Sequence, residues 1–218
     1  VLGEPRDSVN RHVFRGGNFF VLGMLNRYRD ELGVEALPQE LDAAVRRTVD
    51  HLRSESATVR VEQAGVDEAA LTVDVTVESR AGHKLPTAYP SRRAWIHLEV
   101  FDAEGERIWE SGALEPTGAI RGNDNDEDAT RFEPHHRVVT EADQVQIYEA
   151  VMVDAEDRVT TGLLRGVRYA KDNRILPRGF DKGAAHEDVA VEGGAAGDGD
   201  FRGGSDRVRY RVPVAGRV

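Results

Sequence analysis

The 218-residue chain contains no cysteine. This absence excludes disulfide bonds, thiolate metal sites, a cysteine nucleophile and covalent attachment of a c-type haem within the chain. No apolar run approaches the roughly 18–20 residues that cross a bilayer, so we predict no transmembrane segment. Neither a Gly-x-Ser-x-Gly elbow nor a phosphate-binding loop occurs, and the sequence therefore gives no sign of the common hydrolase or nucleotide-binding motifs.

Acidic residues outnumber basic ones, 39 to 29, which gives a formal net charge of −10. A nucleic-acid-binding protein must present cations to phosphates, so we expect no nucleic-acid partner. The composition, 39% hydrophobic and 31% charged, is that of a globular protein large enough for one domain with a small appendage. The first eight residues are polar and resemble no signal sequence, and we expect the chain to be a fragment of a longer protein.

The first quarter of the chain has helical periodicity. Apolar residues recur at helical spacing over residues 18–32, and a second helix is predicted from Pro38 to about Ser54. Gly33 is a plausible C-cap between them. We therefore predict a helical hairpin over residues 1–56.

From residue 57 the periodicity changes to that of strands. Residues 58–63 and 71–78 alternate apolar and polar side chains, and turn sequences separate residues 94–101 from 107–111 and 144–153 from 159–169. Two further short strands are predicted at 189–192 and 207–212, with a Gly- and Asp-rich surface loop at 193–205 between them. The prediction is a mainly-β chain: an antiparallel β-sandwich (Ig-like or jelly-roll-like) over residues 57–218, preceded by an N-terminal helical hairpin.

The segment of residues 81–93 carries more chemistry than an ordinary turn. His83 is able to ligate a metal or a haem iron, or to hold the loop by hydrogen bonds. Arg92 and Arg93 are able to clamp carboxylates such as haem propionates. Two prolines stiffen the segment by fixing φ.

Three further segments have both a functional and a structural interpretation. Asp124, Asp126 and Asp128 place oxygen ligands at alternate positions, as calcium requires, but an acidic solvated loop has the same pattern. His135 and His136 are adjacent, which makes them a weak metal signal. The charged segment 169–181 is interpreted as an ordered connection between sheets, held by Asp172 and Arg174.

A further histidine, His12, precedes the first helix in the sequence His-Val-Phe-Arg-Gly-Gly-Asn. Paired glycines allow the backbone to approach a bulky planar group, and imidazole is the usual axial ligand of haem iron. The structural interpretation is a surface histidine followed by an Asn18 N-cap.

Together these motifs resemble the C-terminal region of bacterial multihaem c-type cytochromes. The resemblance is carried, in this order, by His-x-Phe-x-Gly-Gly-Asn at 12–18, Gly-His-Lys-Leu-Pro-Thr at 82–87, Tyr-Pro-Ser-Arg-Arg at 89–93, Glu-Ser-Gly-Ala at 110–113, Gly-Asn-Asp-Asn-Asp at 122–126, Glu-Pro-His at 133–135, Gln-Val-Gln-Ile-Tyr-Glu at 144–149 and Lys-Asp-Asn-Arg-x-Leu-Pro-x-Gly-Phe-Asp at 171–181.

The resemblance implies a non-catalytic β-sandwich domain, in the periplasm or outside the cell, that follows haem-bearing Cys-x-x-Cys-His sites of the same polypeptide. Haem c would lie in that upstream part, and His12 or His83 would supply axial ligands to it. The helical hairpin would continue the haem-bearing part, and the domain would serve electron transfer without being an enzyme.

Two other functions are consistent with the residues. One is a calcium-supported module that recognises carbohydrate or a protein partner, using Asp124, Asp126 and Asp128. The other is a copper or zinc metalloenzyme built on His83, His135 and His136, which requires these imidazoles to converge.

Overall fold

A computed structural model describes residues 17–87 and 89–214. The chain divides into two compact units, Val1–Glu55 and Ser56–Val218. No helix in the described ranges is both long enough and apolar enough to cross a membrane.

In the first unit, residues 17–55 form two helices, α1 (Phe19–Arg27) and α2 (Pro38–Ser54). The Asn18 side chain caps α1 by accepting a hydrogen bond from the backbone of Val21 (3.2 Å). The Asn26 amide joins the two helices by donating to the carboxylate of Asp42 (2.6 Å). The first helix ends five residues earlier than its apolar spacing predicts, because residues 28–33 form turns that close at Gly33 with a φ of 62°.

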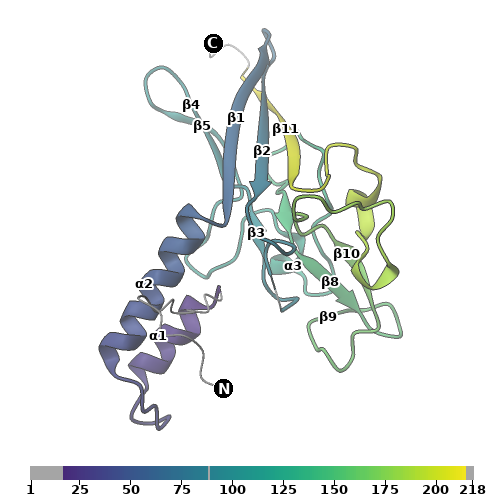
Figure 1. Cartoon of the computed structure of the whole chain (residues 1–218). Coiled ribbons are helices and arrows are strands. Elements are labelled where there is room, and N and C mark those ends of the chain that lie inside the picture. Colours follow the sequence, from purple (N-terminus) through teal and green to yellow (C-terminus); the bar gives the residue numbers. More distant parts are fainter. Residues whose placement is uncertain (1–16, 88, 215–218) are drawn as a thin grey trace, which may run out of the picture. The chain divides into compact units, whose positions relative to one another are not determined.

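The main element of the second unit is a four-stranded sheet with the order β1-β2-β11-β6. Its strands are β1 (Ala57–Val66), β2 (Ala70–Ser79), β11 (Ser205–Pro213) and β6 (Val138–Val139). Figure 1 shows β1, β2 and β11 side by side, with β2 in the middle of the three. The β1–β2 and β2–β11 pairs are antiparallel, whereas the short β6 runs parallel to β11.

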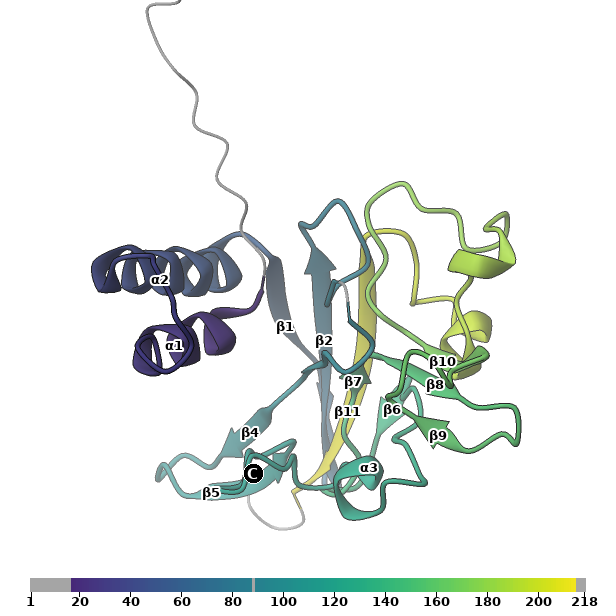
Figure 2. The same ribbon diagram turned by 90° about the horizontal axis from the view of Figure 1, so that it is seen from below.

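Smaller sheets complete this unit. A hairpin joins β4 (Leu98–Phe101) to β5 (Arg107–Ser111), and β3 (Ala94–Trp95) pairs with β7 (Ile147–Tyr148). The strand β8 (Ala150–Val153) lies between β10 (Arg168–Asp172) and β9 (Val159–Thr160), and Figure 2 shows these three together. Short helices occupy Asp124–Glu127 (α3), Glu187–Val189 (η1) and Gly193–Gly197 (η2).

The core lies against one face of β2 and β11. Alternate residues of both strands point into it, including Val75, Val208 and Tyr210, none of which is more than 1% exposed. The ring of Trp109 meets the ring of Tyr210 edge to face, with centroids 5.9 Å apart. This packing explains why strict alternation in the sequence predicts these strands well.

The mainly-β class with antiparallel sheets and an early helical pair is confirmed. The closed two-sheet sandwich stays a prediction, since the strands of residues 17–87 and 89–214 form one four-stranded sheet and three small ones.

The prediction of a surface loop at 193–205 is wrong, because Ala195, Asp198 and Phe201 are at most 1% exposed. The glycines of this segment let it approach other backbone closely: a Cβ at Gly203 would overlap the carbonyl oxygen of Phe180.

Candidate functional site

The histidine of the Glu-Pro-His motif lies in a buried polar network. The amide of Gln146 is oriented by the backbone N–H of His136, which donates to Oε1 (2.7 Å), so Nε2 faces Nδ1 of His135 (2.9 Å). The amide of Asn173 is oriented by the backbone N–H of Glu149, which donates to Oδ1 (3.0 Å), so Nδ2 also faces Nδ1 of His135 (3.1 Å). Because both amides donate to Nδ1, that nitrogen carries no proton.

This tautomer decides what the other side of the His135 ring does. Nε2 carries the ring proton and donates a hydrogen bond to Oδ2 of Asp198, 3.2 Å away. Both side chains are fully buried, and burial lowers the pKa of His135 to about 4 in spite of the opposing effect of Asp198. The imidazole is therefore neutral at physiological pH and oriented on both sides.

His135, Asp198 and Asp206 place one potential metal ligand atom each within 4.8 Å of one another. A metal on Nε2 of His135 would displace the only ring proton, and Nδ1 is unable to take it up because two amide donors face it. Metal-ligating histidines normally donate from their second nitrogen instead. We therefore interpret this cluster as a structural hydrogen-bonded group rather than as a metal centre.

Asp206 is the least conventional member of this cluster. Its Oδ2 accepts a hydrogen bond from the hydroxyl of Tyr148 (2.8 Å), whereas the buried Oδ1 has no partner. Burial raises the pKa of the Asp206 carboxyl to about 7, and burial also raises the pKa of the Tyr148 hydroxyl. A carboxyl group that keeps its proton near neutral pH limits the negative charge inside the domain.

The next buried group is Lys171, whose side chain is 1% exposed. It donates to the backbone carbonyl of Glu133 (2.7 Å) and to Oε1 of Glu149 (2.9 Å). Burial lowers the pKa of Lys171, and the nearby carboxylates oppose this effect. The side chain of Glu133 in turn contacts Nε2 of His136 (2.6 Å), so each of the two adjacent histidines has its own carboxylate.

This network explains many of the motifs that stand out in the sequence. Glu-Pro-His at 133–135, Gln-Val-Gln-Ile-Tyr-Glu at 144–149 and Lys-Asp-Asn-Arg at 171–174 are distant in the chain and meet in one polar interior. In the described residues potential metal ligands gather at His135, Asp198 and Asp206 and at the more exposed His97, Glu99 and Glu110. Neither group contains His83 or His136, so the structure does not bring His83, His135 and His136 together around an ion.

The segment of residues 81–93 is anchored by contacts with residues 172–175. Lys84 donates to Oδ2 of Asp172 (2.7 Å), and Arg174 holds both oxygens of the same carboxylate (2.8 Å each). Leu85 and Ile175 exchange two backbone hydrogen bonds of 2.8 Å. The interpretation of 169–181 as a connection held by Asp172 and Arg174 agrees with these contacts, and its further role is to fix the opening loop.

His83 differs from its neighbours, because its side chain is exposed. No hydrogen bond or ion pair joins it to another residue of 17–87 or 89–214. It lines an open pocket of about 330 Å³ together with Lys84, Arg174 and Phe180. The anchored loop thus presents an unbonded imidazole at the surface.

The two arginines predicted to bind propionates have partners within the domain. Arg93 donates to Oδ1 of Asp126 (2.7 Å), and Arg92 donates to the carbonyl of Thr87 (3.3 Å). The Arg93 contact fixes the end of the loop to α3, and the Arg92 contact closes the loop on itself.

Each of the three aspartate carboxylates in residues 124–128 likewise has its own hydrogen-bond donor. Asp124 pairs with Arg131 (2.7 Å), Asp126 also accepts from the backbone of Ile120 (2.7 Å), and Asp128 accepts from Thr130 (2.7 Å). These hydrogen bonds lower the pKa of Asp126 against the effect of burial, and lower that of Asp128. The three carboxylates form no ligand cluster in the described part of the chain, and calcium stays a prediction.

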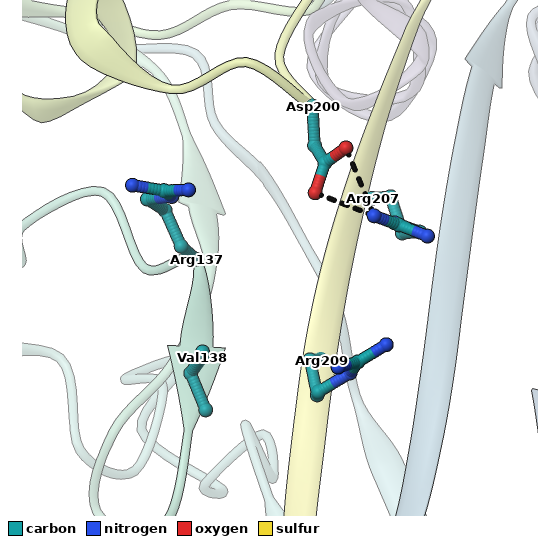
Figure 3. A pocket seen from close by; sticks show the side chains of 5 residues that line it. All are labelled: Arg137, Val138, Asp200, Arg207 and Arg209. Atoms are coloured by element: carbon teal, nitrogen blue, oxygen red, sulfur yellow. Dashed lines mark hydrogen bonds and ion pairs between the residues drawn. The ribbon is translucent and has the colours of Figure 1, made fainter. Parts of the chain in front are cut away.

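A second pocket, of about 310 Å³, is lined by three arginines and resembles an anion site at first sight (Figure 3). Arg207 holds both oxygens of Asp200 (2.8 and 3.0 Å), and Arg209 holds both oxygens of Asp74 (2.7 and 2.8 Å). The guanidinium of Arg137 points away from the other two in Figure 3. Arg137 pairs with Asp198 (3.2 Å). Because the three guanidinium groups do not converge and each already has a carboxylate partner, we assign no ligand here.

His12 lies outside the described residues. The sequence did not predict a functional or buried role for Asp198 or Asp206. Asp206 was the more recognisable of the two, because it occupies a core-facing position in the alternation Asp206, Val208, Tyr210, Val212. We find no family model, curated protein or solved structure that matches the chain.

Proposed function

We propose that the chain is the non-catalytic C-terminal β-domain of a multihaem c-type cytochrome that takes part in electron transfer. The domain packs on the haem-bearing part of the same polypeptide, in the periplasm or outside the cell. His83, and His12 in the segment before α1, are the residues that would supply axial ligands.

The observation that carries the proposal is the state of His83. Its neighbours Lys84 and Leu85 fix the loop to Asp172 and Ile175, while its own imidazole is exposed and unbonded. An axial ligand needs a nitrogen with a free lone pair on a loop that does not have to be ordered on binding. The other motif histidine in the described residues, His135, is buried and bonded on both nitrogens.

The first unit adds independent support. No residue of α1 is buried, and its apolar side chains Phe19, Phe20 and Met24 are between 43% and 69% exposed. Large exposed apolar patches mark surfaces that bind another protein part. A haem-bearing part of the polypeptide would cover this surface.

Haem ligation by His83 is testable with the chain alone. A ferric haem c peptide with a single histidine ligand is titrated with the wild-type chain, and the Soret band reports the six-coordinate low-spin form. We expect His83→Ala to weaken this conversion. His186→Ala is the matched control, because that imidazole is also exposed (72%) but lies beside Asp188.

His12→Ala tests the second ligand in the same titration. Equal conversion by the wild type, His83→Ala and His12→Ala would contradict the ligand assignment.

A further inference from the structure

The outer edge of the four-stranded sheet, formed by β1, is long and has no strand partner among the described residues. β1 has ten residues and stands at the end of the order β1-β2-β11-β6, so no other described strand pairs with its second edge. Val59 and Val61 are 64% and 58% exposed, although they share a face with the buried Val77 and Val75. Such an edge is a template for a further strand.

The hydrogen-bonding groups of this edge follow from the ladder. The N–H of Arg80 donates to the carbonyl of Ser56 (2.9 Å), so residues 56, 58, 60 and 62, which precede the register shift between Gln63 and Gly65, direct their backbone groups toward β2. The backbone groups of Val59, Val61 and Gln63 therefore point outward. These residues offer three N–H and three C=O groups to an incoming strand.

The charges along β1 select which strand fits. Arg60 and Glu62 lie on one face, two residues apart, on either side of Val61. If a second β1 pairs antiparallel with Val61 opposite Val61, each Arg60 lies opposite a Glu62 of the other copy. Because the outward groups belong to odd-numbered residues, these charged pairs occupy the non-hydrogen-bonded positions, where facing side chains are closest.

The neighbouring registers are less favourable. In the two nearest registers that keep each face of the sheet continuous, the two-fold axis lies one residue away from Val61, at Arg60 or at Glu62. Arg60 would then face Arg60, or Glu62 would face Glu62, and like charges directly opposite destabilise a pair.

We propose that two copies of this chain associate through antiparallel pairing of their β1 strands about a two-fold axis at Val61. The two four-stranded sheets then form one continuous sheet, with two reciprocal Arg60–Glu62 pairs on one face and the valines on the other. This interface is independent of haem and of the proposed function.

Sedimentation equilibrium of the 218-residue chain over roughly 1–200 µM tests the proposal, since a small interface dissociates in such a range. We expect a monomer–dimer equilibrium for the wild type. Arg60→Glu or Glu62→Arg alone places like charges opposite each other twice, which should raise the dissociation constant roughly ten-fold or more. The double variant R60E/E62R restores opposite charges and should dimerise like the wild type.

Two further variants separate the edge from the fold. Val61→Pro removes a backbone N–H that points outward and makes no hydrogen bond to β2. This variant should be a monomer with an unchanged melting temperature. Arg211→Glu is the matched control for Arg60→Glu, because each arginine has a carboxylate 4.0 Å away, that of Asp67 for Arg211 and that of Glu78 for Arg60, and Arg211 belongs to β11 rather than to the β1 edge. It should dimerise normally.

A wild-type chain that is monomeric throughout the concentration range would overturn the proposal. A dimer that survives both single charge reversals would place the interface elsewhere. A double variant that stays monomeric would overturn the register.

Discussion

Replacing the carboxyl group of Asp206 with an amide should change how the stability of the domain depends on pH. The folded-state pKa of Asp206, about 7, lies above the ordinary value of 3.8, because the side chain is buried. The folded protein therefore holds this proton at pH values where the unfolded chain has released it. The resulting stabilisation is fully present below the unfolded pKa and is lost as the pH rises through about 7.

The size of the effect follows from these two values. Between about pH 5 and pH 8 the wild type should lose about 2–3 kcal/mol of unfolding free energy through Asp206. Asp206→Asn has no such proton, so it should become more stable relative to the wild type by this amount over the same interval. Any constant cost of the amide, such as an unpaired N–H at the position of Oδ1, is the same at both pH values and cancels in the comparison.

Urea unfolding monitored by tryptophan fluorescence measures this directly, since both tryptophans, Trp95 and Trp109, lie in the second unit. The effect of His135, whose lowered pKa reduces stability as the pH falls from about 6.5 through about 4, is common to both proteins. A stability difference between the two proteins that is equal at both pH values, within about 0.5 kcal/mol, would refute the assignment of a protonated buried carboxyl.

The remaining predictions concern the anchored loop and the close-packed segment before β11. Lys84→Ala removes a charged hydrogen bond to Asp172 and should lower the unfolding free energy by about 1–3 kcal/mol, whereas His83→Ala, at an exposed and unbonded position, should change it by less than about 0.5 kcal/mol. Equal losses in calorimetry would contradict the difference between the two residues. Gly203→Ala should cost about 2–3 kcal/mol because its Cβ meets a backbone carbonyl, and Gly199→Ala, which has nothing within 4 Å, should be nearly neutral in the same urea assay.

Local sequence signals were sufficient for the elements whose packing is local. Alternation predicted residues 71–78 as a strand because β2 buries one face against the core, and turn chemistry predicted the hairpin of β4 and β5. The helix α2 begins at Pro38, as its position in the sequence predicts.

Features that depend on distant partners were not predictable in this way. The burial of Asp198 depends on His135, 63 residues earlier, and that pairing leaves no local pattern. The glycines of 193–205 read as a loop, yet they permit close packing that only the folded neighbours reveal. The central position of β11, between β2 and β6, likewise comes from the topology rather than from its own residues.

The candidate site shows the same division. His83, His135, Asp124 and Arg93 are chemically capable residue types in suggestive positions, but residue type does not state whether a side chain already has a partner. The structure gives His135, Asp124 and Arg93 internal partners and leaves His83 exposed. The loop is therefore fixed by its neighbours Lys84 and Leu85 and exposes the imidazole of His83.

The most direct test of the cytochrome proposal is the coding sequence immediately upstream of Val1. The proposal predicts Cys-x-x-Cys-His motifs there, in the same reading frame, within a polypeptide whose haem part ends shortly before α1. An upstream sequence without any such motif would contradict the proposal.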